Sequence, residues 1–328
     1  MIRNLIVLAL GAIAIPEAAA LCLLESGALR DQAIGSQIIR VAADAPADAS
    51  NPIASYDSDA LGVQLEYGCD NGTPYGKSTV GLNGQNPATY IYETNVPGIG
   101  VKLLWNNGLG ATGNFPSVTT VKLPTNRGIM KIAAGSYFRA QFFKLTDNLV
   151  LSNKAGDLVL PSALRAFNYF NTDAVGEAYA RLNIGNITII STPVCTVDQS
   201  KVIDFTQVTA GALKSGVEKP LNFFVNCRTD YGTYSAKAMM TTADASADST
   251  YIKVTDASGN KDRLGIRITD GKTQTIRMND STSSEQLYNV ASGSNAQYQW
   301  KATLFSTSTE APQPGPFNAK AEIVFNID

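Results

Sequence analysis

The chain has 328 residues, a formal net charge of −2, 44% apolar residues and 16% charged residues. At about 150 residues per domain, this length predicts two domains, and the apolar content predicts packed cores and excludes a disordered chain. The balance of 26 basic and 28 acidic residues excludes an electrostatic nucleic-acid site, and the absence of histidine excludes imidazole catalysis and histidine-bound metals.

The N-terminal segment has the pattern of a secretory signal peptide. Residues 5–15 form an apolar run that is too short to span a bilayer, and Ala18 and Ala20 fit a small-x-small cleavage site. We therefore expect residues 1–20 to be removed and Leu21 to begin the mature protein. An uncleaved membrane anchor is the alternative, and the short run disfavours it. No later segment is apolar enough to span a membrane, so we expect an exported protein.

Four cysteines, Cys22, Cys69, Cys195 and Cys227, fit export to an oxidising compartment. The 126-residue gap in the middle is much longer than the intervals of 47 and 32 residues on either side. We therefore expect two disulfides, Cys22 with Cys69 and Cys195 with Cys227. A metal site made of all four cysteines is the alternative, but no C-x-x-C spacing occurs.

Alternating apolar and polar residues predict strands along both halves of the chain. The pattern begins at residue 138 and recurs over 221–227, 264–269 and 298–304, with Asp270-Gly271 as a hairpin turn. Turns separate the strands and no regular helices intervene. This organisation predicts an all-β protein made of two β-sandwich domains in series.

Two further segments bear on the organisation. Residues 157–170 are the one stretch that fits a short helix. Residues 189–194 contain a proline and fit a linker. We therefore place an N-terminal domain at residues 21–191 and a C-terminal domain at residues 192–328.

The chain ends in a regular alternating pattern, which predicts a strand over residues 317–327. Such a strand pairs either with another part of the chain or with a partner. Its apolar residues are Phe317, Ala319, Ala321, Ile323, Phe325 and Ile327.

Residues 195–328 resemble the pilin domain of chaperone–usher pili. The resemblance rests on Cys195-Thr196-Val197, on the strand 221–227 that ends at Cys227, on the segment 264–269, and on the alternating final strand. It implies an immunoglobulin-like sandwich that lacks its last strand. A periplasmic chaperone would fill the gap first, and the next pilus subunit would replace the chaperone at the outer-membrane usher by β-strand addition. The apolar residues of 317–327 would then lie at the subunit and chaperone interface.

The first half of the chain resembles the receptor-binding domain of a two-domain tip adhesin. Cleavage after Ala20 leaves only Leu21 before Cys22, so we expect no donor strand and a position at the end of the fibre. Residues 92–101 also resemble the T-x-x-P-G-I-G segment of type 3 fimbrial adhesins, although a glycine-requiring turn explains that motif better than ligand contact.

The resemblance to type 1 tip adhesins implies a sugar site, which needs convergent polar groups and an aromatic platform. Leu145 stands where those adhesins have glutamine, so mannose is not predicted. Turn formation at Asp70-Asn71-Gly72 and core packing of Trp105 are the structural alternatives. The candidate ligand-binding residues are Leu21, Asp70, Asn71, Asp147, Asn148 and Trp105.

The sequence therefore predicts a fimbrial tip adhesin that is exported through the periplasm to the pilus tip and binds a host carbohydrate or matrix protein. We expect no cofactor, no metal and no enzymatic activity. A structural subunit or assembly initiator without an external ligand is the first alternative. A secreted glycosidase is the second, but no local acidic pattern marks a catalytic carboxylate pair.

Overall fold

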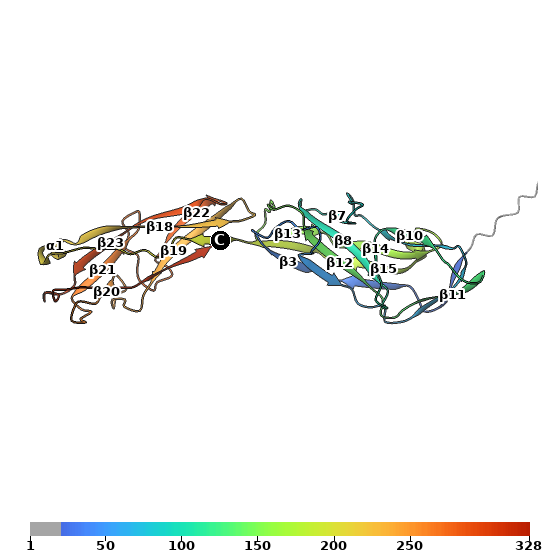
Figure 1. Ribbon diagram of the computed structural model, residues 1–328, viewed down its shortest axis with the longest axis horizontal. Helices are drawn as coiled ribbons and strands as arrows, with labels where there is room; N and C mark the ends of the chain where they lie inside the picture. Colours follow the sequence, from blue (N-terminus) through green and yellow to red (C-terminus); the bar gives the residue numbers. More distant parts are fainter. Residues whose placement is uncertain (1–20) are drawn as a thin grey trace, which may run out of the picture.

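The computed structural model describes residues 21–328, and the expected signal peptide lies outside the described residues. Two groups of strands lie end to end along the long axis, and the C-terminus lies close to where they meet (Figure 1). Each group encloses its own apolar core. The structure thus confirms the predicted fold class of two β domains in series. No helix within residues 21–328 is long and apolar enough to cross a membrane.

The N-terminal domain contains four sheets, with the strand orders β1-β5-β11, β10-β6-β14-β15-β2, β4-β12-β8-β7 with β9 on β8, and β13-β16-β3. Only β15 with β2 and β16 with β3 pair in parallel. The elements are β1 (Cys22–Ser26), β2 (Arg30–Ile34), β3 (Gln37–Ala42), β4 (Ala54–Asp57), β5 (Leu65–Asp70), β6 (Pro74–Thr79), β7 (Tyr92–Glu93), β8 (Ile99–Asn106), β9 (Thr112–Asn114), β10 (Ser117–Thr120), β11 (Arg127–Ile132), β12 (Tyr137–Lys144), β13 (Asp157–Leu160), β14 (Ala163–Phe170), the 3-10 helix η1 (Val175–Glu177), β15 (Ala178–Ile184) and β16 (Ile187–Thr192).

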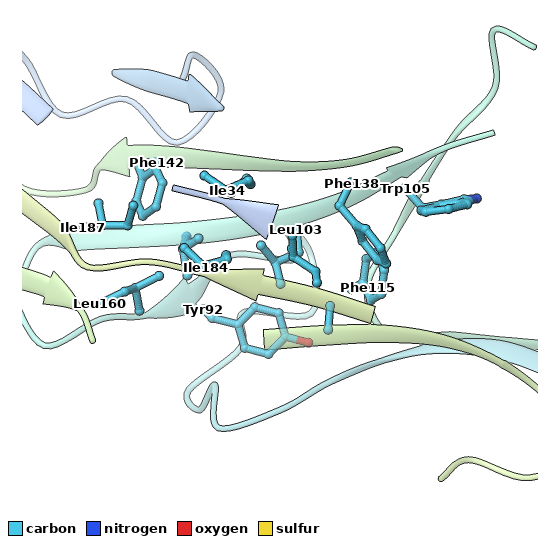
Figure 2. Packing of buried hydrophobic residues seen from close by; sticks show 14 of the residues in the cluster. Ile34, Tyr92, Leu103, Trp105, Phe115, Phe138, Phe142, Leu160, Ile184 and Ile187 are labelled. Atoms are coloured by element: carbon cyan, nitrogen blue, oxygen red, sulfur yellow. The ribbon is translucent and has the colours of Figure 1, made fainter. Parts of the chain in front are cut away.

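Strands β8 and β12 supply much of this domain's core (Figure 2). They pair so that Phe138 lies opposite Trp105 and Ala140 opposite Leu103. Phe138 and Ala140 point inward together because alternate residues of a strand share a face. The rings of Trp105 and Phe138 meet edge to face, with their centroids 4.7 Å apart. Burial of each large side chain contributes about 1.5–3 kcal/mol, so this row anchors the sandwich.

The C-terminal domain has two sheets, β17-β18-β23-β21-β20 and β22-β19-β24. Between them, the Tyr298 ring stacks on Phe223 at 4.9 Å. The Tyr298 hydroxyl donates to the carbonyl of Ala236 at 2.7 Å, so its polar end is satisfied inside the core. The elements are β17 (Val194–Val197), α1 (Ala210–Ser215), β18 (Val217–Arg228), β19 (Thr233–Thr241), β20 (Ile252–Val254), β21 (Leu264–Thr269), β22 (Glu285–Ala291), β23 (Asn295–Ser306) and β24 (Glu322–Ile327).

Both expected disulfides are present. Cys22 of β1 lies directly opposite Cys69 of β5, and Cys195 of β17 lies opposite Cys227 of β18. Each bond therefore fastens the first strand of a domain to the neighbouring strand of its sheet.

The helix expected over 157–170 is wrong. These residues form β13 and β14, and a short turn joins the two strands. Six consecutive residues at the end of β14 are buried, because one face lies on the main core and Phe167 and Tyr169 pack in a smaller cluster on the other. A strand that is buried on both faces shows no alternation, which explains the error.

Two other features differ from the sequence prediction. The final strand is shorter than 317–327, because β24 begins only at Glu322, and Asn318 forms an isolated bridge with Thr255 instead. Helix α1 was not predicted. The Thr209 side chain caps its N-terminus by accepting from the backbone N–H of Ala212.

The segment that resembles the type 3 adhesin motif forms a turn between β7 and β8. Gly98 has φ +86°, a conformation that side chains other than glycine rarely adopt. The Thr94 hydroxyl donates to the carbonyl of Ile99 at 2.8 Å and closes the turn.

Candidate functional site

The core of the C-terminal domain is open along β24. Within residues 21–328, no strand pairs with the outer edge of β24. The inward-facing residues of the neighbouring β19 are at most 3% exposed, whereas those of β24 remain half-buried although they touch the same core. We call this feature the open edge and define it by β24 and its inward row Ile323, Phe325 and Ile327.

The open edge has the physical properties of a strand acceptor. Phe325 lies 5.9 Å from the rings of Phe223 and Tyr298, so the row continues the apolar core toward solvent. The unpaired backbone N–H and C=O groups of an edge strand pair readily with another extended chain. An added strand would satisfy these groups and cover the half-buried row.

Three of the six residues predicted for the subunit interface form this row. Phe317, Ala319 and Ala321 precede β24, and Ala319 is exposed.

Three candidate ligand residues gather at the end of the N-terminal domain farthest from the C-terminal domain, beside β11 (Figure 1). The Leu21 backbone N–H donates to the Asp70 carboxylate at 3.2 Å, and Arg127 forms an ion pair with the same carboxylate at 3.2 Å. The Asn71 side chain accepts from the backbone N–H of Leu123. The backbone of Leu21 and the side chains of Asp70 and Asn71 are thus used in local contacts, while the Leu21 side chain is 43% exposed.

Asp147 and Asn148 lie at the opposite end, where the two domains meet. Arg228 of the C-terminal domain donates to the carbonyl of Asp147 at 2.8 Å and to the Asn148 side chain at 2.6 Å. The Asp147 carboxylate accepts from the backbone N–H of Ala47 at 2.9 Å. The structure therefore does not bring these residues together with Leu21, Asp70 and Asn71.

The junction is built around the turn between β18 and β19. Asp230, in that turn, is 4% exposed and accepts from the backbone N–H of Leu149 at 3.1 Å and from the Ser191 hydroxyl at 2.6 Å. The next residue, Tyr231, packs against the N-terminal core and accepts from the Ser191 backbone N–H. The linker at Pro193, between β16 and β17, is thus one of two connections between the domains.

Trp105 is only 7% exposed and lies at one end of the core cluster (Figure 2). Its ring packs on Phe138 and Tyr179 and offers no free face for a sugar, so core packing, the structural alternative for Trp105, is what the structure shows.

Within the described part of the chain, no three histidine, cysteine or acidic side chains are grouped as metal ligands. Two groups of functional interest were missed by sequence reasoning. One is the junction around Asp230, and the other surrounds Arg165, a buried arginine in β14. The arginine within an apolar stretch was the available signal for the second.

Comparison with known proteins identifies the C-terminal domain. Residues 185–328 match the family model described as "Fimbrial protein". No curated protein sequence matches the chain. The resemblance to fimbrial proteins is thus confirmed over the C-terminal domain, and the chain carries the domain of a fimbrial subunit.

Solved structures with some similarity include two adhesins and a complex of a chaperone with a tip subunit. The receptor-binding domain of the adhesin MrkD1P of Klebsiella pneumoniae is 17% identical, and the match covers 56% of this chain and 100% of that chain with a TM-score of 0.39. The CupB6 tip adhesin of Pseudomonas aeruginosa is 13% identical, with 94% of each chain covered and a TM-score of 0.36. The match to the CsuC–CsuE chaperone and tip subunit complex of Acinetobacter baumannii is 9% identical and covers 93% of this chain and 99% of that chain, with a TM-score of 0.35.

Proposed function

We propose that the protein is the tip adhesin of a chaperone–usher pilus. Its C-terminal domain accepts a strand from a periplasmic chaperone and later, at the outer-membrane usher, from the next pilus subunit. Its N-terminal domain then presents a binding surface for a host carbohydrate or matrix protein at the cell surface. The role is binding and anchoring rather than catalysis.

The observation that carries this proposal is the open edge. In a finished β-sandwich the inward residues of every strand are buried, but Ile323, Phe325 and Ile327 remain half-buried beside an unpaired edge. An exposed apolar edge favours aggregation, so a protein that keeps one needs a partner to cover it. The family match over residues 185–328 supports a pilus partner in this role.

The arrangement of the domains supports the assignment of ligand binding to the N-terminal domain. This domain extends from the C-terminal domain along the long axis, and its far end is remote from the open edge (Figure 1). A strand seated on β24 would therefore leave that end accessible.

A structural subunit without an external ligand is a second candidate. It is favoured by one observation, namely that the candidate ligand residues divide between the far end and the domain junction, where Arg228 engages Asn148.

Two matched variants of β24 test the strand-acceptor role. Phe325→Asp places a charge in the inward row, where an unpaired carboxylate is strongly disfavoured. Val324→Asp places the same charge on the outer face, where Val324 is 38% exposed. After co-expression with the cognate chaperone, we expect Val324→Asp to co-purify with it and Phe325→Asp to lose at least about 90% of the complex. Equal recovery of both variants would refute the role.

A second experiment tests adhesion itself. Cells that assemble pili with or without this subunit are compared for attachment to host glycans and matrix proteins. Normal pilus assembly with unchanged attachment would favour the structural-subunit candidate.

A further inference from the structure

A cavity of about 240 Å³ lies on the N-terminal domain, and none of the candidate ligand residues lines it. Segments that follow β6, β7 and β13 surround it, together with the start of β14. Its lining residues are Gly81, Leu82, Asn83, Glu93, Thr94, Asn95, Leu160, Pro161 and Arg165.

A buried arginine contributes to the lining of this cavity. Arg165 is 5% exposed, and its two terminal nitrogens donate to the carbonyls of Gly81 at 3.1 Å and Pro161 at 2.6 Å. The third nitrogen, Nε, is buried without a hydrogen-bond partner. Within residues 21–328, Arg165 forms no ion pair. Burial lowers the pKa of its guanidinium.

The buried positive charge of Arg165 destabilises the fold and cannot be removed by deprotonation. An arginine stays protonated in proteins, so it cannot escape burial by losing its proton. A buried charge without a counter-ion is destabilising, and an anion placed in the cavity would offset that cost. The planar guanidinium is suited to a carboxylate in particular.

Polar side chains surround the opening of the cavity. Asn83, Glu93 and Asn95 are exposed and line the cavity. Amide and carboxylate groups of this kind donate to and accept from vicinal hydroxyl groups. Leu160 and Pro161 give the wall an apolar part.

The cavity is held open by backbone hydrogen bonds between its walls. The N–H of Glu93 donates to the carbonyl of Asn83, and the N–H of Asn95 donates to the carbonyl of Val159, both at 3.1 Å. A site that is already formed loses little conformational entropy when a ligand binds. Its volume lies below the roughly 300–1,000 Å³ of sites for drug-sized ligands, so it suits a single sugar ring.

We propose that this cavity binds one acidic sugar unit of a glycan, a uronic or a sialic acid. The sugar carboxylate faces the Arg165 guanidinium, and its hydroxyl groups bond to Asn83 and Asn95. This inference rests on the proposed adhesin function and names its ligand class.

The test is a titration of the full mature chain, in complex with its chaperone, with three probes. The probes are the methyl glycosides of glucuronic acid, N-acetylneuraminic acid and glucose. We expect one of the two acidic probes to bind at least about tenfold more tightly than the neutral glucoside, and its identity distinguishes a uronic from a sialic acid. Equal binding of all three probes, or no binding of either acid, would overturn the proposal.

Variants of residues at the opening test whether the ligand binds in this cavity. Asn95→Ala removes one hydroxyl partner and should weaken binding of the acidic probe about three- to tenfold. Glu93→Gln removes a like charge close to the sugar carboxylate and should tighten binding about threefold. Asp59→Asn is the matched control, since Asp59 is an exposed carboxylate outside the cavity, and should change nothing. If Asn95→Ala and Glu93→Gln behave like the control, the acid binds elsewhere and the proposal is wrong.

The two proposals fail in different ways. If chaperone capture depends on Phe325 but neither acidic sugar binds, only the acidic-sugar proposal is refuted. If Phe325→Asp and Val324→Asp are recovered equally with the chaperone, the strand-acceptor role is refuted instead, whatever the cavity binds.

Discussion

Asp230 joins the two domains, and its replacement by alanine should loosen the junction measurably. The carboxylate bonds to the backbone N–H of Leu149 at 3.1 Å and to the hydroxyl of Ser191 at 2.6 Å, and all three residues are at most 4% exposed. Asp230→Ala leaves two buried donors without partners, at about 1–3 kcal/mol each. Relief of the buried charge offsets part of this cost. We expect a net loss of about 3 kcal/mol in the local stability of the junction.

Amide hydrogen exchange measures this loss where it occurs. A loss of about 3 kcal/mol corresponds to about 100-fold faster exchange at the Leu149 amide when exchange follows local opening. The measurement is made by mass spectrometry on peptides that span residues 146–152, with the full chain. Asp262→Ala is the control, because the Asp262 side chain is 81% exposed and lies outside the junction. Exchange in Asp230→Ala within about threefold of the unsubstituted chain would refute the role of this carboxylate.

Three further changes should alter stability in defined ways. Replacing Cys195 and Cys227 together by alanine opens a loop with a sequence separation of 32 residues and should lower the free energy of unfolding by about 4 kcal/mol, measured as a shift in the urea midpoint. Hydrogen bonds, first from Asn260, lower the pKa of the Asp256 carboxyl to about 2, so its stabilisation is complete above its unfolded pKa of about 3.9 and is lost as the pH falls toward 2. Asp256→Asn should reduce the fall of the urea midpoint between pH 4 and pH 2. An unchanged dependence of the midpoint on pH would contradict this account. Gly98→Ala should cost about 2 kcal/mol, because φ is +86° and the new Cβ would clash with the hydroxyl oxygen of Thr146. Gly35→Ala, with open space around it, should leave the thermal midpoint unchanged.

The fold was predictable where a strand has one face in the core and one in solvent. Strand β23 alternates buried and exposed residues along most of its length, and the pattern predicted its position. Strand β14 has buried residues on both faces, so its composition resembled that of a buried helix. The disulfides were predictable for a different reason, since long intervals of chain separate the two domains and each cysteine pair closes within its own domain.

The sites were less predictable, because they depend on which segments meet in space. Asp147 and Asn148 have the polar character of a ligand loop, but Arg228, about 80 residues later, bonds to both at the domain junction. The cavity at Arg165 combines segments around Asn83, Asn95 and Pro161, which no sequence motif connects. Only the isolated charge in an apolar stretch marked that cavity in the sequence.

The position of β19 links the open edge to the junction. One end of β19 follows the turn in which Asp230 bonds to Leu149, and the rest of the strand pairs with β24 from Ala236 to Thr241. The backbones of Ser235 and Asp328 also exchange hydrogen bonds, at 2.8 Å and 3.0 Å, so the end of the chain is fastened to the same strand. If a partner strand binds at β24 as proposed, a load on that strand reaches the N-terminal domain through β19 and the buried carboxylate of Asp230, in parallel with the linker. Since the two routes share the load, weakening Asp230 should concentrate it on the linker and let the domains separate at lower force.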